Sequence, residues 1–130
     1  MYSTQLLDHF QNPRNVGDLS EADATADIEN PVCGDVIRIS IKMNGDRIQE
    51  IRFKAKGCVP AIACGSALTE LVRGKTAQEV RRLKRDDLVA AVGGVPPAST
   101  HAAQLALDAV SNALAQIDSA RKASSRETEQ

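Results

Sequence analysis

The alternation of apolar and polar residues in two neighbouring segments constrains the fold more than any other feature of the sequence. Every second residue is apolar, namely Ile37, Ile39, Ile41 and Met43 in the first segment and Ile51, Phe53 and Ala55 in the second. A period of two predicts strands that each bury one face. Asn44-Gly45 lies between the segments and is a preferred pair for a tight turn. We therefore predict an antiparallel hairpin in the middle of the chain.

The residues before the hairpin predict a helix and a further strand. Apolar residues within 4–12 have helical spacing, and Ser3 or Thr4 can cap the first turn. Pro13 ends this helix, because proline disfavours helix at the residue before it. Residues 23–29 alternate as a strand does, although alanine is a weak strand former. They supply the predicted third strand.

After Gly57 the pattern changes to helical spacing. Gly74 ends the first helical segment, and Thr76 forms a capping box with Glu79 at the start of the next. Residues 93–97 contain Gly-Gly and Pro-Pro pairs that break the pattern before the last helix. The predicted helices cover residues 61–73, 76–83, 86–92 and 100–117.

Strands followed by helices indicate an α+β fold. We predict a three-stranded antiparallel sheet with helices packed on one face, in a single domain of residues 1–118. Residues 119–130 are polar and charged, and we predict that this tail is disordered.

Composition argues against several classes of function. Aromatic residues make up only 2% of the chain and tryptophan is absent, which disfavours a surface for stacking bases. The net charge of −1 gives no electrostatic footprint for nucleic acid. No apolar run approaches the ~20 residues that a membrane span needs. The first four residues lack the basic and then apolar layout of a signal peptide, so we expect a cytoplasmic protein.

The chain has three cysteines, Cys33, Cys58 and Cys64. An odd number in a reducing compartment argues against a disulfide framework. The alternatives are free thiols, metal ligands or a nucleophile that handles sulfur. Cys64 lies inside a predicted helix between Ala63 and Gly65, where packing against the sheet is a more common role for cysteine than metal binding.

The hairpin brings Cys33 and Cys58 to the same end of the sheet, since one precedes the first strand and the other follows the second. A helix N-terminus lowers the pKa of a thiol, and Cys58 lies directly before a predicted helix. Asp35 offers a hard oxygen two residues after Cys33. His101 lies at the start of the last helix, where the helix dipole disfavours the imidazolium form, and a metal requires the neutral form.

These side chains form a set of four candidate ligands. The set is Cys33, Asp35, Cys58 and His101, with Cys64 as a further possibility. Such a set could hold Zn²⁺ tetrahedrally or a small iron–sulfur cluster with mixed ligation. The spacing itself is not specific for metal, because the chain has no Cys-x₂-Cys pair. Taken singly, Asp35 could serve the turn after Gly34, and His101 could bond the backbone at the helix start.

Several segments between Tyr2 and the last predicted helix are similar to the motifs of one known family. The segments are residues 2–3, 8–17, 33–35, 53–58, 61–63, 69–70, 95–101 and 108–109. On these motifs the chain resembles the iron–sulfur cluster assembly scaffolds of the IscU/NifU N-terminal type. The resemblance implies an IscU-like fold and a scaffold or carrier rather than an enzyme.

The resemblance also implies a function and its partners. Scaffolds of this type take sulfur as persulfide from a cysteine desulfurase, take up iron, build a transient [2Fe–2S] cluster and pass it to apo-proteins. Three cysteines, an aspartate and a histidine line the family's site, and zinc can occupy it in the absence of iron. The matching positions in this chain are Cys33, Asp35, Cys58 and His101.

The chain departs from the family pattern directly after the histidine. Where the family has His-Cys, this chain has His101-Ala102. The missing third cysteine is the one usually credited with accepting persulfide sulfur. Residues 96–99 read Pro-Pro-Ala-Ser in place of the family's Pro-Pro-Val-Lys, so docking of the family's dedicated chaperone is in doubt. The insertion of zinc-type SufU-like members, between Cys58 and His101, is absent, which favours the IscU branch.

Three functions are therefore alternatives. The first is a working scaffold with a reduced ligand set, which the retained motifs favour. The second is a zinc-bound sulfur-relay protein with Cys33 or Cys58 as the acceptor. The third is a non-catalytic paralogue that docks on a cysteine desulfurase, which Ala102 and Ser99 favour.

Overall fold

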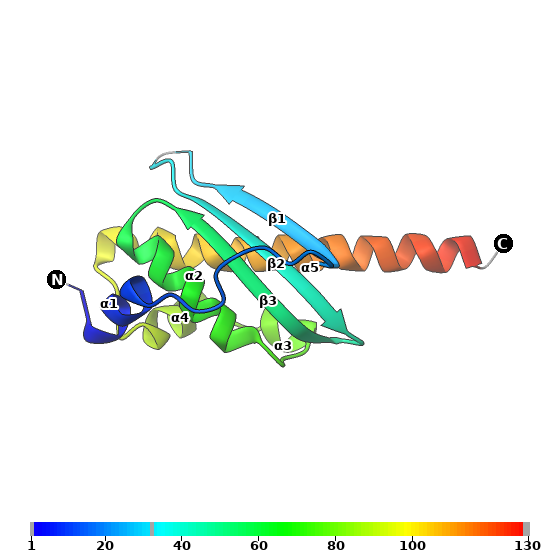
Figure 1. Cartoon of the computed structure of the whole chain (residues 1–130), viewed down its shortest axis with the longest axis horizontal. Helices are drawn as coiled ribbons and strands as arrows, with labels where there is room; N and C mark the ends of the chain where they lie inside the picture. The colour runs from blue at the N-terminus through cyan, green and yellow to red at the C-terminus, as the bar shows by residue number, and fades with distance from the viewer. Residues whose placement is uncertain (1, 32, 129–130) are drawn as a thin grey trace.

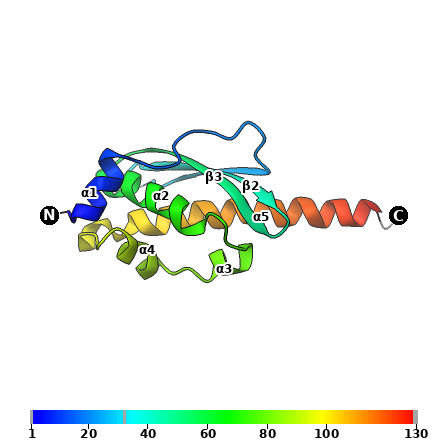
Figure 2. The same cartoon turned by 60° about the horizontal axis from the view of Figure 1, so that its bottom comes forward.

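The computed structural model describes residues 2–31 and 33–128 of the chain. Its elements are α1 (Thr4–Gln11), β1 (Ala24–Glu29), β2 (Val36–Asn44), β3 (Arg47–Lys56), α2 (Val59–Val72), α3 (Ala77–Arg81), α4 (Arg85–Ala91), the 3₁₀ turn η1 (Pro97–Ser99) and α5 (Thr100–Thr128). The three strands form one antiparallel sheet in the order β1-β2-β3. The helices lie on one side of this sheet (Figures 1 and 2). The predicted α+β fold class is confirmed.

The turn of the β2–β3 hairpin lies one residue later than predicted. Asn44 pairs with Arg47, so Gly45 and Asp46 form the turn instead of Asn44-Gly45. Gly45 has φ +65°, and Asn15 is the only non-glycine residue with positive φ in the described part of the chain. A two-residue hairpin turn with glycine at its first position needs a positive φ only there.

β3 begins earlier than predicted because the ladder contains an irregularity. The pairing shifts between Lys42 and Met43, which leaves Gln49 as an extra residue in β3. An extra residue changes the face to which the side chains beyond it point. As a result, Ile48 and Ile51 are both buried, although they are three positions apart and would point to opposite faces of a regular strand.

The core is aliphatic and rich in alanine, and Phe53 is its largest fully buried side chain. Phe53 projects from β3 toward α2 and packs over Gly65. A Cβ atom at Gly65 would lie 2.7 Å from the Phe53 ring. Glycine at this position therefore allows α2 to approach the sheet closely. Cys64, the neighbour of Gly65, has an exposed fraction of 0%, consistent with the predicted packing role.

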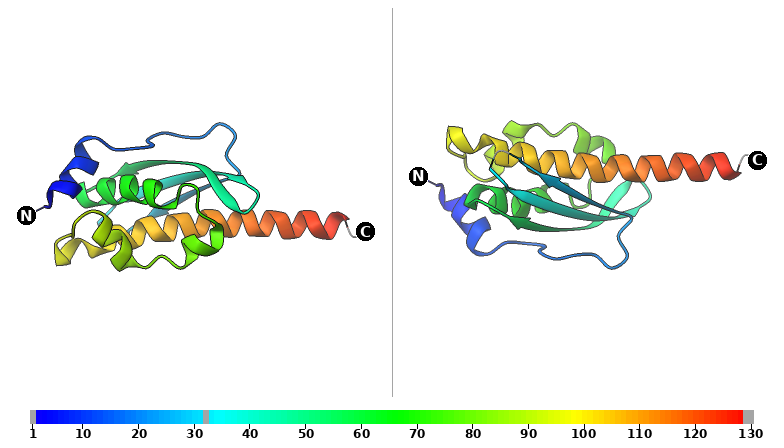
Figure 3. Two further views of the ribbon diagram at one scale, coloured as in Figure 1. Left: turned by 90° about the horizontal axis from the view of Figure 1, so that it is seen from below. Right: turned by 90° about the horizontal axis from the view of Figure 1, so that it is seen from above.

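α5 is longer than predicted. We expected a helix to residue 117 and a disordered tail over 119–130, whereas the helix continues to Thr128. No glycine or proline follows Ile117, and the segment contains alanine, arginine, lysine and glutamate, which are good helix formers. The Arg121 guanidinium also donates to the carbonyl of Gly45 (2.6 Å). The end of α5 extends past the sheet (Figure 3). Over the described residues, no helix has the length and apolar character of a membrane span.

Candidate metal centre

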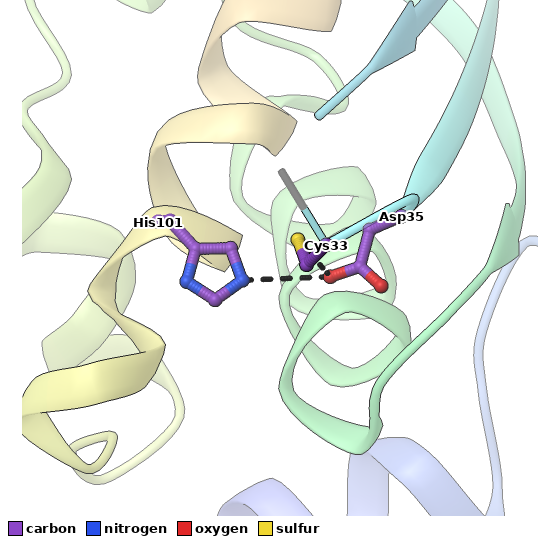
Figure 4. Close-up of side chains that lie close together, drawn as sticks. All are labelled: Cys33, Asp35 and His101. Carbon is purple, nitrogen blue, oxygen red and sulfur yellow. Dashed lines mark hydrogen bonds and ion pairs between the residues drawn. The ribbon is translucent and has the colours of Figure 1, made fainter. Parts of the chain in front are cut away.

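The candidate ligands lie at the ends of elements that meet at one end of the sheet. Cys33 and Asp35 precede β2, Cys58 is the N-cap of α2, and His101 lies in the first turn of α5. The first β2–β3 pair joins Val36 to Lys56, so the residues before β2 lie beside those after β3. The structure therefore places Cys58 beside Asp35, as the hairpin topology indicated for the two cysteine segments. Figure 4 shows three of the four predicted side chains, Cys33, Asp35 and His101, close together.

One oxygen of Asp35 is the shared neighbour of the other three side chains. The Cys33 Sγ lies 3.4 Å and the Cys58 Sγ 3.2 Å from Asp35 Oδ2. The His101 Nε2 lies 3.5 Å from the same oxygen. The ligand atoms of Cys33, Asp35 and His101 all lie within 4.8 Å of one another. This spacing is suited to a single metal ion or a small cluster that replaces the thiol protons.

The Asp35 carboxylate is ionised although it is buried. Its exposed fraction is 3%. Burial by itself raises its pKa, but hydrogen bonds from the Cys58 and Cys33 thiols and from the Cys58 N–H bring the pKa below its ordinary value. The Cys58 N–H, at the N-terminus of α2, donates to Oδ1 (3.1 Å). A carboxylate is favoured at this position by the helix dipole.

His101 directs its Nε2 atom toward Asp35 in the centre (Figure 4). Its Nδ1 lies 3.2 Å from the carbonyl oxygen of Ala98, which accepts a hydrogen bond from this nitrogen when the nitrogen carries a proton. The Nε2 is buried and has no hydrogen-bond partner among the described residues. This nitrogen faces the Oδ2 atom of Asp35 at 3.5 Å. A cation between the two atoms would satisfy both, so the geometry fits a metal.

The two thiols of the centre differ in exposure. Cys33 is exposed, and Cys58 is partly buried. Burial raises the pKa of the Cys58 thiol, and the nearby Asp35 carboxylate raises it too, although an N–H of α2 acts in the opposite direction. The helix N-terminus thus acts on this pKa in the expected direction, through the N–H of Ala61, but burial has the larger effect and the pKa is raised overall. A bound cation would favour the thiolate, since metal binding releases the thiol proton.

Cys64 is separate from this group. Burial raises the pKa of its thiol to about 12. The compact group of Cys33, Asp35 and His101 ligand atoms contains neither Cys64 nor Cys58. Cys58 nevertheless lies 3.2 Å from Asp35 Oδ2, whereas Cys64 belongs to the buried hydrophobic core. Packing against the sheet is its role in the structure.

Thiol labelling should distinguish these three cysteines. At pH 8 we expect Cys33 to react first with a disulfide reagent, Cys58 to follow, and Cys64 to react only after denaturation. The reason is that a thiolate must be both formed and accessible. Mass spectrometry of the labelled peptides gives the order, and fast labelling of Cys64 in the folded protein would contradict the buried placement.

Ala102 contributes to the core beside the centre. Its exposed fraction is 1%. The position at which the resemblance implies a third cysteine therefore supplies a buried methyl group.

Two contributors to the centre were not predicted from the sequence. The Ala98 carbonyl orients the imidazole of His101, and this contact depends on the path of η1. Gly57 leaves the space that Asp35 occupies. The only sequence signal for Gly57 was a glycine directly before a candidate cysteine ligand.

Comparison with known proteins agrees with this fold. Residues 1–124 match the family described as the NifU-like N terminal domain. The chain belongs to this family. Among NifU-like N-terminal domain relatives, "Iron-sulfur cluster assembly scaffold protein IscU 1" of Archaeoglobus fulgidus is 45% identical over 122 residues, which cover 94% of this chain and 78% of the relative.

Two further relatives extend the comparison. "Iron-sulfur cluster assembly scaffold protein IscU" of Escherichia coli K12 is 39% identical over 126 residues, covering 94% of this chain and 98% of the relative. The crystal structure of a NifU-like protein (N-terminal) from Brucella abortus superimposes with a TM-score of 0.75. The superposition covers 90% of this chain and 94% of the Brucella abortus chain, at 24% sequence identity, and supports the fold.

Proposed function

We propose that this NifU-like N-terminal protein is a scaffold on which an iron–sulfur cluster is assembled and from which it is passed to apo-proteins. The proposed ligands are Cys33, Asp35, Cys58 and His101. The proposal is supported by identity of 39–45% to IscU scaffolds over most of the chain. The observation that carries it is the convergence of two thiols and an unpartnered imidazole nitrogen on one carboxylate oxygen.

The donor set suits a transient cargo. Thiolates bind the iron of clusters, and replacement of thiolate by other ligands changes the properties of the cluster. Here two of the four donors are a carboxylate and an imidazole. The exposure of Cys33 leaves the centre accessible from solvent. We therefore infer that the [2Fe–2S] cluster is held loosely enough to be transferred, and that Zn²⁺ can occupy the same donors.

The proposed partners are those that the similarity to IscU scaffolds implies. A cysteine desulfurase would supply sulfur as persulfide, and apo-proteins would accept the finished cluster. The exposed Cys33 is the thiol most open to a partner, which favours a zinc-bound sulfur relay as the second candidate function. In that case Cys33 would accept sulfur, while Asp35, Cys58 and His101 hold the ion.

Reconstitution separates these functions. Iron and acid-labile sulfide per chain are measured after anaerobic, desulfurase-driven assembly, and zinc is measured in the untreated protein. We expect roughly stoichiometric iron and sulfide. Stable zinc with stimulation of the desulfurase but no sulfide would instead support the relay. Neither metal nor sulfide would contradict both and leave a module that docks on the desulfurase.

A separate prediction concerns a cysteine introduced at position 102, where the family resemblance implies the third cysteine of the site. Ala102→Cys should increase the persulfide that the chain accepts from a desulfurase, because the resemblance places the family's acceptor thiol at this position. The substitution enlarges a buried side chain, and overpacking costs about 1–3 kcal/mol of stability. Persulfide per chain is measured by mass spectrometry, and folding by thermal denaturation.

A matched control for this variant is Ala103→Cys, which adds the same thiol to a neighbouring position with an exposed fraction of 0%. It turns the thiol by about 100° around the helix. We expect no additional persulfide in this control. Equal persulfide in both variants, or none in a folded Ala102→Cys protein, would contradict the alignment at the start of α5.

A further inference from the structure

The centre is organised around the carboxylate of Asp35. Both thiols and the imidazole nitrogen lie 3.2–3.5 Å from Oδ2, while Oδ1 accepts the N–H of Cys58. Each oxygen therefore has a distinct task. Oδ1 fixes the carboxylate to the first turn of α2, and Oδ2 brings the other candidate ligands to a common point. The position of this one carboxylate sets the spacing of the whole group.

The carboxylate can take this position only because residue 57 has no side chain. A Cβ atom at Gly57 would lie 2.1 Å from Oδ1, 2.6 Å from Cγ and 3.0 Å from Cβ of Asp35. Rotating the carboxylate about its own axis would not relieve contacts with Cγ and Cβ. The entire Asp35 side chain would have to leave, and its bond to the Cys58 N–H would be lost.

We infer that Gly57 is a positioning residue of the metal centre, acting through Asp35. Its missing side chain leaves the space from which the carboxylate gathers the other candidate ligands. The inference rests on the proposed function in one respect, namely that these side chains bind metal. It adds a residue that touches no metal and determines where one of its ligands lies.

Backbone conformation alone does not explain the space at Gly57. Its φ of +149° favours glycine, but Gly74 and Gly94 also have positive φ, and a Cβ atom at either would have no atom within 4 Å. At Gly93 the added atom would meet the side-chain ends of Gln5 and Ser3. Among these glycines, Gly57 is the one at which a Cβ atom would collide with a candidate ligand, Asp35.

The test uses Co²⁺ as the metal probe, because thiolate-to-cobalt absorption reports binding without cluster assembly. Gly57→Ala should weaken Co²⁺ binding about 10- to 100-fold, the range for residues that orient a metal ligand. Gly74→Ala is the control for backbone strain, since it replaces a glycine of φ +84° with no nearby atom. We expect its Co²⁺ affinity to equal that of the unmodified protein.

A double variant tests whether the effect passes through Asp35. Asp35→Ala should weaken Co²⁺ binding by itself. Adding Gly57→Ala to it should cause little further loss, because the contacts with Oδ1 and Cγ at 2.1 and 2.6 Å are gone and only the 3.0 Å contact with the Cβ atom remains. Asp35→Asn keeps the size of the side chain, so Gly57→Ala should still lower the thermal stability in that background. If Gly57→Ala alone fails to fold, the double variant with Asp35→Ala should restore folding.

The outcomes separate the inference from the proposed function. Unchanged Co²⁺ affinity in a folded Gly57→Ala protein would overturn the inference and leave the scaffold intact. The inference would also be overturned if Gly57→Ala lowered the Co²⁺ affinity equally in the unmodified protein and in the Asp35→Ala variant. Absence of a thiolate–cobalt band in the unmodified protein would contradict the proposed function itself.

Discussion

Replacing Cys58 with serine is expected to abolish tight metal binding while the protein stays folded. The substitution removes the thiol that lies 3.2 Å from Asp35 Oδ2. Losing a direct ligand should exceed the roughly 10- to 100-fold loss typical of residues that only orient one. Co²⁺ titration measures the affinity, and iron and sulfide analysis after reconstitution should show that the cluster is not retained.

The fold should tolerate this change because of the position of Cys58. It is the N-cap of α2 and its side chain makes no capping hydrogen bond, whereas serine is among the preferred N-cap residues. Thermal denaturation should therefore show equal or higher stability. A folded Cys58→Ser protein that still retains a cluster would remove Cys58 from the ligand set.

Cys64→Ala is the matched control, since it also removes one thiol from α2. We expect full metal affinity and a lower stability, because the buried Cys64 packs in the core. Loss of metal from the folded control would show that Cys64 takes part in the centre, contrary to its placement outside the ligand group.

Replacing Phe53 with alanine is expected to lower the free energy of unfolding by about 3–5 kcal/mol. Phe53 has an exposed fraction of 1%, and its ring packs over Gly65, where no side chain can move in to fill the cavity. Its backbone is also held from outside the hairpin, since its N–H donates to Asn15 and its carbonyl accepts from Gly17. The strand therefore stays in place and the cavity stays open. Urea denaturation measures the loss.

Lys54→Ala provides the control for Phe53. Lys54 is the next residue of β3, lies on the opposite, exposed face and forms an ion pair with Asp18. A surface change of this kind alters stability by about 0.5 kcal/mol or less. Similar losses in the two variants, or a loss below about 1 kcal/mol for Phe53→Ala, would contradict the placement of Phe53 at the centre of the core.

The hairpin could be predicted from the sequence because its signal is local. Apolar residues at every second position allow one register in which all of them face the helices. The extra residue at Gln49 was not predictable in the same way. A bulge depends on how the strands twist and pack against α2 and α5, and no short motif encodes that. The one-residue error in the turn has the same origin, since Asn44 extends the ladder once the register has shifted.

The candidate centre likewise has features that the sequence predicts and features that depend on packing. The hairpin topology alone predicts that Cys33 and Cys58 lie at one end of the sheet. The direction in which Cys58 titrates depends on burial, which outweighs the helix N-terminus and is a property of the packed molecule. The end of α5 was predicted wrongly because polarity was taken as disorder, although strong helix formers continue past Ile117.

The candidate ligands lie at the ends of strands and helices, and this location has a consequence for the binding and release of metal. The last β1–β2 pair joins Glu29 to Val36, so Cys33 and Asp35 lie outside the strand ladder, and Cys58 and His101 lie in the first turns of two helices. A bound metal would cross-link three segments that are distant in the chain, and its departure would remove the cross-link without unpairing a strand. Binding and release of metal would thus form and break a cross-link between these segments without requiring a change in strand pairing.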